Sequence, residues 1–396
     1  MHKRDIDIAV IGGGLAGGLI ALALAKLRPE LRVTIVEGGT CFGGNHVWSS
    51  FASDIAAENE WLVEPLVTAR WDGYDVHFPG HSRSLTTAYR SIASERLDAA
   101  LREALPEEAL LTGVQVSRVE RNRALLADGR KLEAGAVIDA RGAPALPHMA
   151  GGWQKFVGQM LRLERPHGLS RPVVMDARVA QLDGYRFVYC LPFSDSEVFV
   201  EDTYYADGAG LDVPALRQRI ADYAAGRGWT VAEVTREETG VLPVIGSGDF
   251  AAFWPGGGGE GPARAGTRAA LLHPLTSYSL PDAVRLARHI CSLPDLSGAA
   301  LAGASYAWAR AHWGRGSFYR MLTKMLFAAA RPEQRYRMLE RFYRLPQPLI
   351  ERFYAGRSTP ADALRILAGK PPVPISSALA SLAGMGRPLA PLESAA

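Results

Sequence analysis

The sequence has few cysteines, almost no excess of one charge and no long apolar run free of helix-breaking residues. Its three cysteines, Cys41, Cys190 and Cys291, are odd in number and far apart, which excludes a disulfide framework and favours a reducing compartment. A net charge of +3 over 396 residues gives little general attraction for phosphate, so we expect no nucleic-acid partner. With 48% hydrophobic residues, the chain is able to bury a sizeable core in two or three domain-sized units.

Signatures of metal sites, serine nucleophiles and targeting segments are also missing. No cluster of histidines and cysteines has metal-ligand spacing, and there is no G-x-S-x-G turn. We therefore expect no metal. The longest uncharged run, residues 8–25, contains five glycines and is followed by no small-residue cleavage site, unlike a spanning helix or a signal peptide. A cytoplasmic protein whose membrane contact is peripheral fits these features.

The same run marks the start of a nucleotide-binding unit. Residues 6–11 (IDIAVI) have the length and composition of a buried strand, residues 15–27 (LAGGLIALALAKL) those of a helix, and residues 32–36 (RVTIV) those of a second strand. Strand, turn, helix and strand within about 30 residues form one βαβ unit.

The glycines of this unit have the spacing of a dinucleotide-binding turn. Gly12, Gly14 and Gly17 give G-x-G-x-x-G between the strand and the helix. The first glycine allows a tight turn, the second lets the backbone approach a pyrophosphate, and the third lets the helix pack on the strand. Glu37 ends the next strand, where a carboxylate accepts hydrogen bonds from ribose hydroxyls. The alternative is a glycine-rich turn with a surface glutamate.

Two further features favour FAD over NAD. Residues 38–44 form a second glycine-rich loop, and the apolar strand 136–140 ends at Arg141. Both features resemble FAD-binding oxidoreductases of the two-domain, hydroxylase-like group, in which a distant third segment covers the flavin. Residues 266–283 are the candidate for that segment. Thr267 stands where the hydroxylases have an aspartate that contacts the flavin ribityl chain.

These segments predict an α/β fold with a discontinuous Rossmann-type FAD-binding domain (residues 1–150 and 265–300). A β-rich substrate domain (151–264), a helical basic region (301–370) and a loosely ordered tail (371–396) complete the chain. Within this scheme we expect helices over residues 85–105 and 213–225 and from about Pro281, and strands over residues 114–119, 124–132, 172–180, 185–192 and 197–205.

The helical region has an uneven charge. Residues 301–357 contain eleven Arg or Lys against three acids, interleaved with aromatic and aliphatic residues. Such a pattern is typical either of a helical domain with a solvated basic face or of an element at a membrane surface, where basic residues meet anionic headgroups and apolar side chains enter the acyl boundary.

Four motifs carry a closer resemblance. They are residues 44–49 (GNHVWS), 199–205 (FVEDTYY), 273–281 (HPLTSYSLP) and 318–322 (FYRML). Together they resemble bacterial lycopene beta-cyclases over nearly the whole chain. Ser277 departs from the family pattern, which has glycine there.

The resemblance implies a redox-neutral cyclisation in carotenoid biosynthesis at a membrane surface. Lycopene is protonated at a terminal double bond, the cation closes to a ring, and loss of a ring proton leaves a beta-ionone end. Reduced FAD is required, with NADPH as its reductant. Besides the three glycines and Glu37, the expected cofactor-binding residues are Gly44, His46, Arg141, His273, Pro274 and Ser279.

Strand periodicity selects a proton donor independently. On residues 197–205 side chains alternate, so Glu201 and Asp202 lie on opposite faces and cannot both enter one pocket. A carboxyl that protonates an alkene must stay neutral near pH 7, and burial favours the neutral form. We predict Glu201 as the acid and retain Asp202 as a catalytic candidate with a supporting or structural role. An exposed or ion-paired Glu201 is the alternative.

A cationic intermediate also needs a stabilising wall. Trp48, Tyr204, Tyr205 and Trp308 are candidates through cation–π attraction, although aromatic residues at such positions also serve as plain core. His273 either orients the flavin, takes a proton or is structural.

Two other functions fit parts of the pattern. A redox flavoenzyme, either an FAD- and NADPH-dependent hydroxylase or a prenyl-chain reductase, would use the same nucleotide site. A lipid-binding carrier with a vestigial nucleotide fold would use the apolar helices. The sequence gives no indication of oligomeric state.

Overall fold

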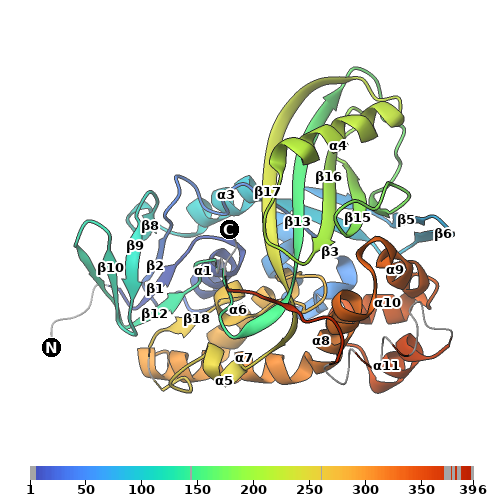
Figure 1. The fold of residues 1–396 in the computed structure, drawn as a ribbon. Coiled ribbons are helices and arrows are strands. Elements are labelled where there is room, and N and C mark those ends of the chain that lie inside the picture. Colours follow the sequence, from blue (N-terminus) through green and yellow to red (C-terminus); the bar gives the residue numbers. More distant parts are fainter. Residues whose placement is uncertain are drawn as a thin grey trace.

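The computed structural model describes residues 6–142, 145–259, 261–369, 376, 380 and 385–393. A nucleotide-type sheet with its helices, a tall upright sheet and a group of C-terminal helices make up the molecule (Figure 1). Within the described residues no helix combines the length and apolarity needed to cross a membrane, and no group of side chains is suited to hold a metal ion.

A parallel five-stranded sheet forms the nucleotide-type unit. Its order is β18 (Ala263–Arg264), β12 (Ala136–Asp139), β1 (Ile8–Ile11), β2 (Val33–Val36) and β8 (Leu110–Leu111). Strands β1, β2 and β12 are buried at every residue, as expected when helices cover both faces of a parallel sheet.

Helices from distant parts of the chain pack around this sheet. The first, α1 (Leu15–Leu27), contacts α3 (Ser94–Ala104) and α6 (Leu280–Ser292). The helix predicted to begin near Pro281 is therefore confirmed as α6, with proline in its first turn. The βαβ unit that the glycine pattern predicted is confirmed as well.

Two small sheets adjoin this unit. One consists of β9 (Val116–Val119), β10 (Arg123–Leu126) and β11 (Lys131–Glu133), and the other of β3 (Val47–Phe51), β7 (Tyr89–Ala93) and β4 (Ala69–Trp71). The single strand predicted over residues 124–132 is wrong, because a turn with Gly129 at a φ of +88° divides it into β10 and β11.

The helix predicted over residues 85–105 is wrong in its first half. Residues 89–93 form β7, which pairs with both β3 and β4, and α3 begins only at Ser94. The leucines at spacings of four, Leu97, Leu101 and Leu105, lie in or next to α3 itself, and residues 85–93 precede them.

The tall sheet has eight strands. Its path is β17 (Val231–Gly248), β13 (Met149–Leu163), β16 (Glu197–Ala206), β15 (Tyr185–Pro192), β14 (Val173–Asp176), β5 (Tyr74–Phe78) and β6 (His81–Leu85), and β19 (Ala390–Pro391) pairs with β13. Helix α4 (Val213–Gly226) lies across one face (Figure 1). Strands β5 and β6 come from the first 150 residues, the range predicted for the nucleotide-binding domain.

The longest strands, β13 and β17, have no counterpart in the sequence prediction. Strand β13 contains glycines at 151, 152 and 158, and β17 contains four charged residues among its first eight. Neither shows the strict alternation of apolar and polar residues by which half-buried strands are detected. The strand predicted over residues 172–180 ends earlier, at Asp176.

The C-terminal region is helical, as predicted. It contains α7 (Gly298–Arg315), α8 (Ser317–Lys324), a π-helical turn (Met325–Ala329), α9 (Tyr336–Phe342), α10 (Gln347–Tyr354) and α11 (Pro360–Leu367). Short helices α2 (Glu60–Val63) and α5 (Phe250–Phe253) complete the set of described α-helices.

The tail is only partly among the described residues. Within it, Ala390 and Pro391 pair with β13 and Leu392 is fully buried, so the expectation of a loosely ordered tail is wrong for this segment. Of the predicted tail, residues 371–396, the structure describes 376, 380 and 385–393, and the prediction for the other residues lies outside the described part of the chain.

Candidate functional site

The glycine turn leaves no room for side chains on its inner side. Gly12 has a φ of +103°, and a Cβ there would meet the backbone of Ala140 and Arg141 at 2.7 Å. A Cβ on Gly17 would collide with the carbonyl oxygen of Gly12. The close approach of α1 to β1 and β12 therefore requires glycine at both positions, as the motif predicts.

The N-terminus of α1 opens onto free space. A Cβ placed on Gly14 would meet no atom within 4 Å. Helix α1 has no side-chain cap and no acidic residue in its first turn, so no described side chain at its N-cap or in its own first turn occupies its first N–H groups. Such a terminus is suited to bind an anion such as a pyrophosphate.

Glu37 lies beside this turn at the end of β2. Its Oε2 accepts a hydrogen bond from the N–H of Gly13 at 2.7 Å, and its Oε1 accepts one from the N–H of Gly39 at 2.8 Å. Each carboxylate oxygen keeps a second lone pair, so the carboxylate is fixed in place and still able to accept from a ribose. The donors and acceptors present here fit a dinucleotide.

A cavity of about 590 Å³ begins at this helix N-terminus and extends to the tall sheet. Its walls come from α1, β3, the tall sheet and the loop before α6. They include Gly14, Leu15, Ala16, His46, Trp48, Ser49, Asp54, Gly142, Gln154, Phe156, Met175, Phe187, Tyr189, Glu201, Glu238, Leu242, Thr267, Ser277, Tyr278 and Ser279. Most of this lining is apolar or aromatic, with a few polar groups that converge from different elements, which is typical of a small-molecule site.

Glu201 projects from β16 into the cavity, on the face predicted by strand alternation. Its side chain is half-buried, and the part that remains accessible faces the cavity. The hydroxyl of Thr203 donates a hydrogen bond to its Oε1. Burial, reinforced by the nearby Glu238 carboxylate, raises the pKa of Glu201 to about 8, and the Thr203 hydrogen bond offsets only part of this effect. The side chain is therefore a protonated carboxylic acid near neutral pH.

Asp202 lies on the opposite face of β16. It is fully buried, and both of its oxygens accept hydrogen bonds from Nε of Arg186 at 2.9–3.0 Å. Its surroundings are the apolar cluster beneath α4, which includes Val200 and Tyr204. Asp202 is not among the residues that line the cavity, and its position fits the supporting or structural role expected for it.

The four aromatic candidates lie in different surroundings. Trp48 lines the cavity. Tyr204 points to the α4 side, where the Lys155 ammonium lies 4.7 Å from its ring centroid, and Tyr205 is buried with its hydroxyl donating to Gln154 at 2.9 Å. Trp308, on α7, stacks on His289 at a centroid distance of 4.4 Å. Tyr204, Tyr205 and Trp308 are not among the residues that line the cavity, so the structure does not bring them together with Trp48 there.

Some of the predicted cofactor residues outside the glycine turn line the cavity, and others do not. His46 and Ser279 line the cavity. Gly44 lies nearby in a left-handed turn with a φ of +66°. Arg141 is turned toward Asp139, with an NH2–Oδ2 distance of 2.8 Å, and donates to the carbonyl of Val116.

His273 and Pro274 lie behind the cavity wall rather than in it. The Nε2–H of His273 donates to the carbonyl of Phe353 at 3.1 Å, and its Nδ1 accepts from the N–H groups of Leu275 and Thr276 at 3.3 Å. Burial lowers the pKa of His273 to about 4. Of the roles expected for His273, the structure supports the structural one: a neutral imidazole that holds the loop before α6.

Ser277 shows how the departure from the family pattern is accommodated. Its φ of +58° lies in the left-handed region that glycine favours. The Ser277 hydroxyl donates to the carbonyl of Pro243 at 2.5 Å, which holds the turn against the tall sheet. The backbone therefore keeps a glycine-like conformation although the residue is serine.

Two acids of the cavity were missed by the sequence analysis. Asp54 is buried at the end of a 3₁₀ turn (Ala52–Asp54). Its Oδ2 accepts from the N–H of Phe51 at 3.0 Å, and its Oδ1 has no hydrogen-bond partner within the described ranges of the chain. Burial raises the pKa of Asp54 to about 7. Glu238 is buried on β17. The acid-rich segment EVTREET could not have identified Glu238, because nothing in the local sequence distinguishes it from Glu237.

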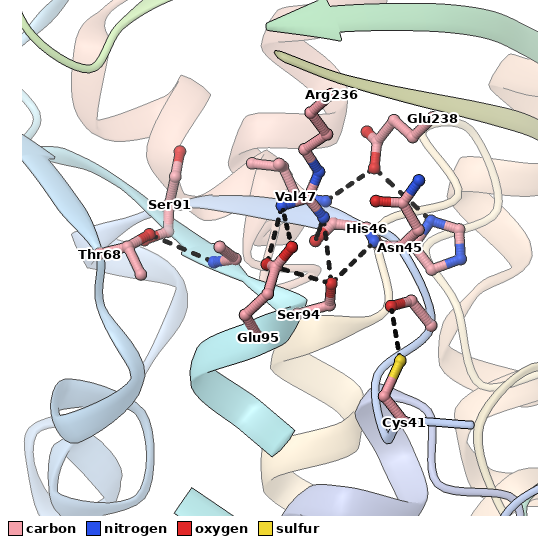
Figure 2. Close-up of polar contacts among 12 residues, drawn as sticks. Cys41, Asn45, His46, Val47, Thr68, Ser91, Ser94, Glu95, Arg236 and Glu238 are labelled. Carbon is pink, nitrogen blue, oxygen red and sulfur yellow. Dashed lines mark hydrogen bonds and ion pairs between the residues drawn. The ribbon is translucent and has the colours of Figure 1, made fainter. Parts of the chain in front are cut away.

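Glu238 belongs to a polar cluster that joins β17 to the loop before β3 (Figure 2). Its Oε2 accepts from the N–H of Val47 at 2.8 Å and lies 3.7 Å from Nδ1 of His46. Arg236 donates to the carbonyl of His46 and to Oγ of Ser94, both at 3.0 Å, and pairs with Glu95 at 2.8 Å. These bonds fix His46 and Val47 at the cavity wall.

Comparison with known proteins agrees with this geometry. The family model described as lycopene cyclase protein matches residues 7–380. A lycopene beta-cyclase from Pseudescherichia vulneris is 48% identical over 373 residues, which is 94% of this chain and 96% of that protein. Another, from Pantoea ananas, is 43% identical over 377 residues, 95% of this chain and 97% of that protein.

A solved structure shows the fold. Klebsiella pneumoniae HpxO, complexed with FAD and uric acid, superposes with a TM-score of 0.62 at 13% identity and covers 90% of this chain and 97% of its own. The predicted two-domain, hydroxylase-like fold is thereby confirmed. Together with the family model and the bacterial relatives, these findings show that the chain belongs to the lycopene cyclase family.

Proposed function

We propose that this protein is a lycopene beta-cyclase that uses reduced FAD. The observation that carries the proposal is the presence, in one cavity, of a nucleotide-binding helix terminus and a carboxyl group, Glu201, that is protonated near neutral pH. An uncharged acid in an apolar pocket is what protonation of an alkene requires.

The glycine turn, the N-terminus of α1 and Glu37 would hold the nucleotide part of FAD, and residues such as Gly142, Thr267 and Ser279 would line its flavin part. When bound, reduced flavin would supply an electron-rich ring system that favours a nearby positive charge. We further propose NADPH as the reductant that keeps the flavin in this state.

The chain's own residues account for the acid step and for cation protection. Glu201 gives its proton to the terminal double bond of lycopene, and the resulting cation closes to a six-membered ring. Trp48, Phe187 and Tyr189 line the same cavity and stabilise the cation through their ring faces. The apolar lining excludes water, which would otherwise trap the cation as an alcohol. Loss of a ring proton completes the beta-ionone end.

We propose that the substrate reaches the cavity from a membrane surface and that the contact is peripheral. Residues 301–357 carry the basic and aromatic pattern described above. On α11, Leu364 is 72% exposed and Leu367 is 43% exposed, a degree of apolar exposure that fits insertion among headgroups. Flotation with anionic vesicles tests this: Leu364→Ser with Leu367→Ser should weaken binding, and unchanged flotation would reject the contact at α11.

Product analysis tests the function itself. Purified protein is incubated with lycopene in liposomes, with FAD either reduced or oxidised. We expect beta-ionone rings only with reduced FAD and no stoichiometric consumption of NADPH. A one-to-one consumption of NADPH with product would favour a hydroxylase or reductase instead, and the absence of ring formation would contradict the proposal.

A further inference from the structure

Two carboxyl groups face the cavity from one wall of the tall sheet. In the register of the strands, Gly158 on β13 pairs with Glu201 on one side and with Glu238 on the other. Directly paired residues on neighbouring strands point to the same face, and both glutamates indeed line the cavity. Two strand spacings separate their backbones by about 10 Å.

An aromatic ring occupies the space between them. A Cβ on Gly158 would collide with the ring of Phe199, which is itself fully buried and lies on the same face of β16 as Glu201. The phenyl ring therefore takes the place of a side chain at Gly158. Because of this ring the two carboxyls occupy separate positions along the wall instead of sharing one proton.

The two carboxyls have different partners. Among the described residues, the side chain of Glu201 has the hydroxyl of Thr203 as its hydrogen-bonding neighbour, and it is protonated near neutrality. Glu238 accepts from the N–H of Val47 and lies next to the imidazole of His46 (Figure 2). In the described part of the chain, Oε1 of Glu238 makes no hydrogen bond. Pairs of acids in contrasting environments divide into a proton donor and a proton acceptor.

We propose that Glu238 is the base that accepts the ring proton, an inference that rests on the cyclase function proposed above. Glu201 donates its proton to the terminal double bond and the new carbon–carbon bond closes the ring. Glu238 then removes a proton from a ring carbon, and the electron pair of that C–H bond becomes the ring double bond. No electrons are gained or lost.

The proton balance also closes over one turnover. One proton has moved from Glu201 to Glu238. His46, whose side chain is 47% exposed, lies between Glu238 and solvent and offers a route by which that proton leaves. Glu201 is reprotonated from water between turnovers, which its raised pKa favours near neutrality.

Other charged and titratable groups surround Glu201 and Glu238. They are His46 before β3, Arg236 on β17 with its partner Glu95 on α3, Asp202 behind β16 with its partner Arg186, Tyr189 on β15, Tyr278 before α6 and Asp54 after β3. Arg236 is neutralised by Glu95, and Asp202 by Arg186.

The experiment compares Glu238→Gln with Glu238→Asp and with the control Glu237→Gln in holoenzyme containing reduced FAD. Glutamine keeps an oxygen that accepts from Val47 but cannot take a proton. Aspartate keeps the carboxylate. Glu237 is the adjacent acid on the same strand, turned to the other side and paired with Arg217 at 2.5 Å. Flavin content and thermal melting are measured for every variant.

We expect kcat for lycopene cyclisation to fall by about 100-fold or more in Glu238→Gln, the usual contribution of a positioned base. Glu238→Asp should recover at least tenfold of that loss, and Glu237→Gln should match the wild type. A Glu238→Gln enzyme within threefold of wild type, or a Glu238→Asp enzyme no faster than Glu238→Gln, would overturn the proposal. Failure of the cyclase function would appear differently, as a wild-type protein that forms no ring.

Discussion

The two faces of β16 give adjacent acids opposite properties. Glu201 faces a cavity, where the described part of the chain gives it the Thr203 hydroxyl as a hydrogen-bonding neighbour and another carboxyl nearby, so its proton is retained. Asp202, one residue on, faces an apolar cluster in which Arg186 supplies two donor nitrogens. Neither acid has bulk solvent as its main partner. Burial raises the pKa of both carboxyls, but at Asp202 the hydrogen bonds and charge of Arg186 offset part of this effect, whereas at Glu201 the neighbouring Glu238 carboxylate adds to it.

We expect the largest effect from replacing Glu201, the acid on the cavity face of β16. Glu201→Gln removes the proton donor while keeping the shape and the Thr203 contact, so kcat should fall by about 10³-fold or more. Flavin content and the melting temperature should stay at wild-type values. Product analysis on lycopene measures the rate, and substantial ring formation by this variant would show that another group delivers the proton.

The second effect concerns the acid of the opposite face. Asp202→Asn leaves the buried Arg186 without its counter-charge, and the free energy of unfolding should fall by about 3–5 kcal/mol. Denaturant unfolding measures the loss. The control is Glu197→Gln on the same strand, where the exposed pair with Arg162 has an N–O distance of 3.3 Å and contributes at most about 1 kcal/mol. If Asp202→Asn and Glu197→Gln had equal free energies of unfolding, Asp202 would not be the structural anchor that its buried pair with Arg186 indicates.

A third effect is a shift of the proton-binding equilibrium of Glu201. Because the Glu238 carboxylate raises the pKa of Glu201, Glu238→Gln should lower the midpoint of Glu201 titration by about one pH unit. Infrared titration of the protonated carboxyl measures this without turnover. An unchanged midpoint would mean that the two carboxyls do not interact.

The same raised pKa has a consequence for stability. In the unfolded chain Glu201 loses its proton around its ordinary value of 4.5, whereas the folded protein keeps it up to about 8. The folded state therefore binds more protons in this interval, and the Glu201 contribution to stability falls as pH rises from about 4.5 to about 8. Thermal melting should show a smaller decline across this interval in Glu201→Gln than in the wild type, and parallel declines would contradict the assignment.

The smallest effect comes from the hydroxyl beside Glu201. Its hydrogen bond lowers the pKa of Glu201, so Thr203→Val should raise the titration midpoint by less than one pH unit, opposite in sign to the effect of Glu238→Gln. The isosteric side chain keeps the packing. A downward shift in this variant would show that the hydroxyl does not act by stabilising the ionised carboxylate.

Local patterns in the sequence were sufficient to predict the nucleotide-type unit and the faces of β16. The glycine spacing demands a close approach of helix and strand, and Gly12 and Gly17 show that approach. The alternation of residues 197–205 separated Glu201 from Asp202 because a strand has a period of two. These features depend only on residues close together in the chain.

Features that depend on pairing between distant strands could not be predicted. Glu238 faces the cavity because of its register with Gly158, and β17 contains bulges relative to β13 that reset the alternation along it. The positions of Tyr204 and Trp308 outside the cavity lining could not be predicted for a related reason. Trp308 lies on a helix whose packing partner, His289 on α6, is not apparent from local sequence, and Tyr204 satisfied the motif while pointing to the α4 side.

The central claim is that Glu201 is a neutral acid in the cavity at physiological pH. The most direct measurement is infrared difference spectroscopy of the holoenzyme as a function of pH, with Glu201→Gln as the reference that identifies the band. The account predicts a protonated-carboxyl C=O band that is present at pH 7, absent in the variant and lost with a midpoint near pH 8. A Glu201 side chain already ionised at pH 7 would contradict it.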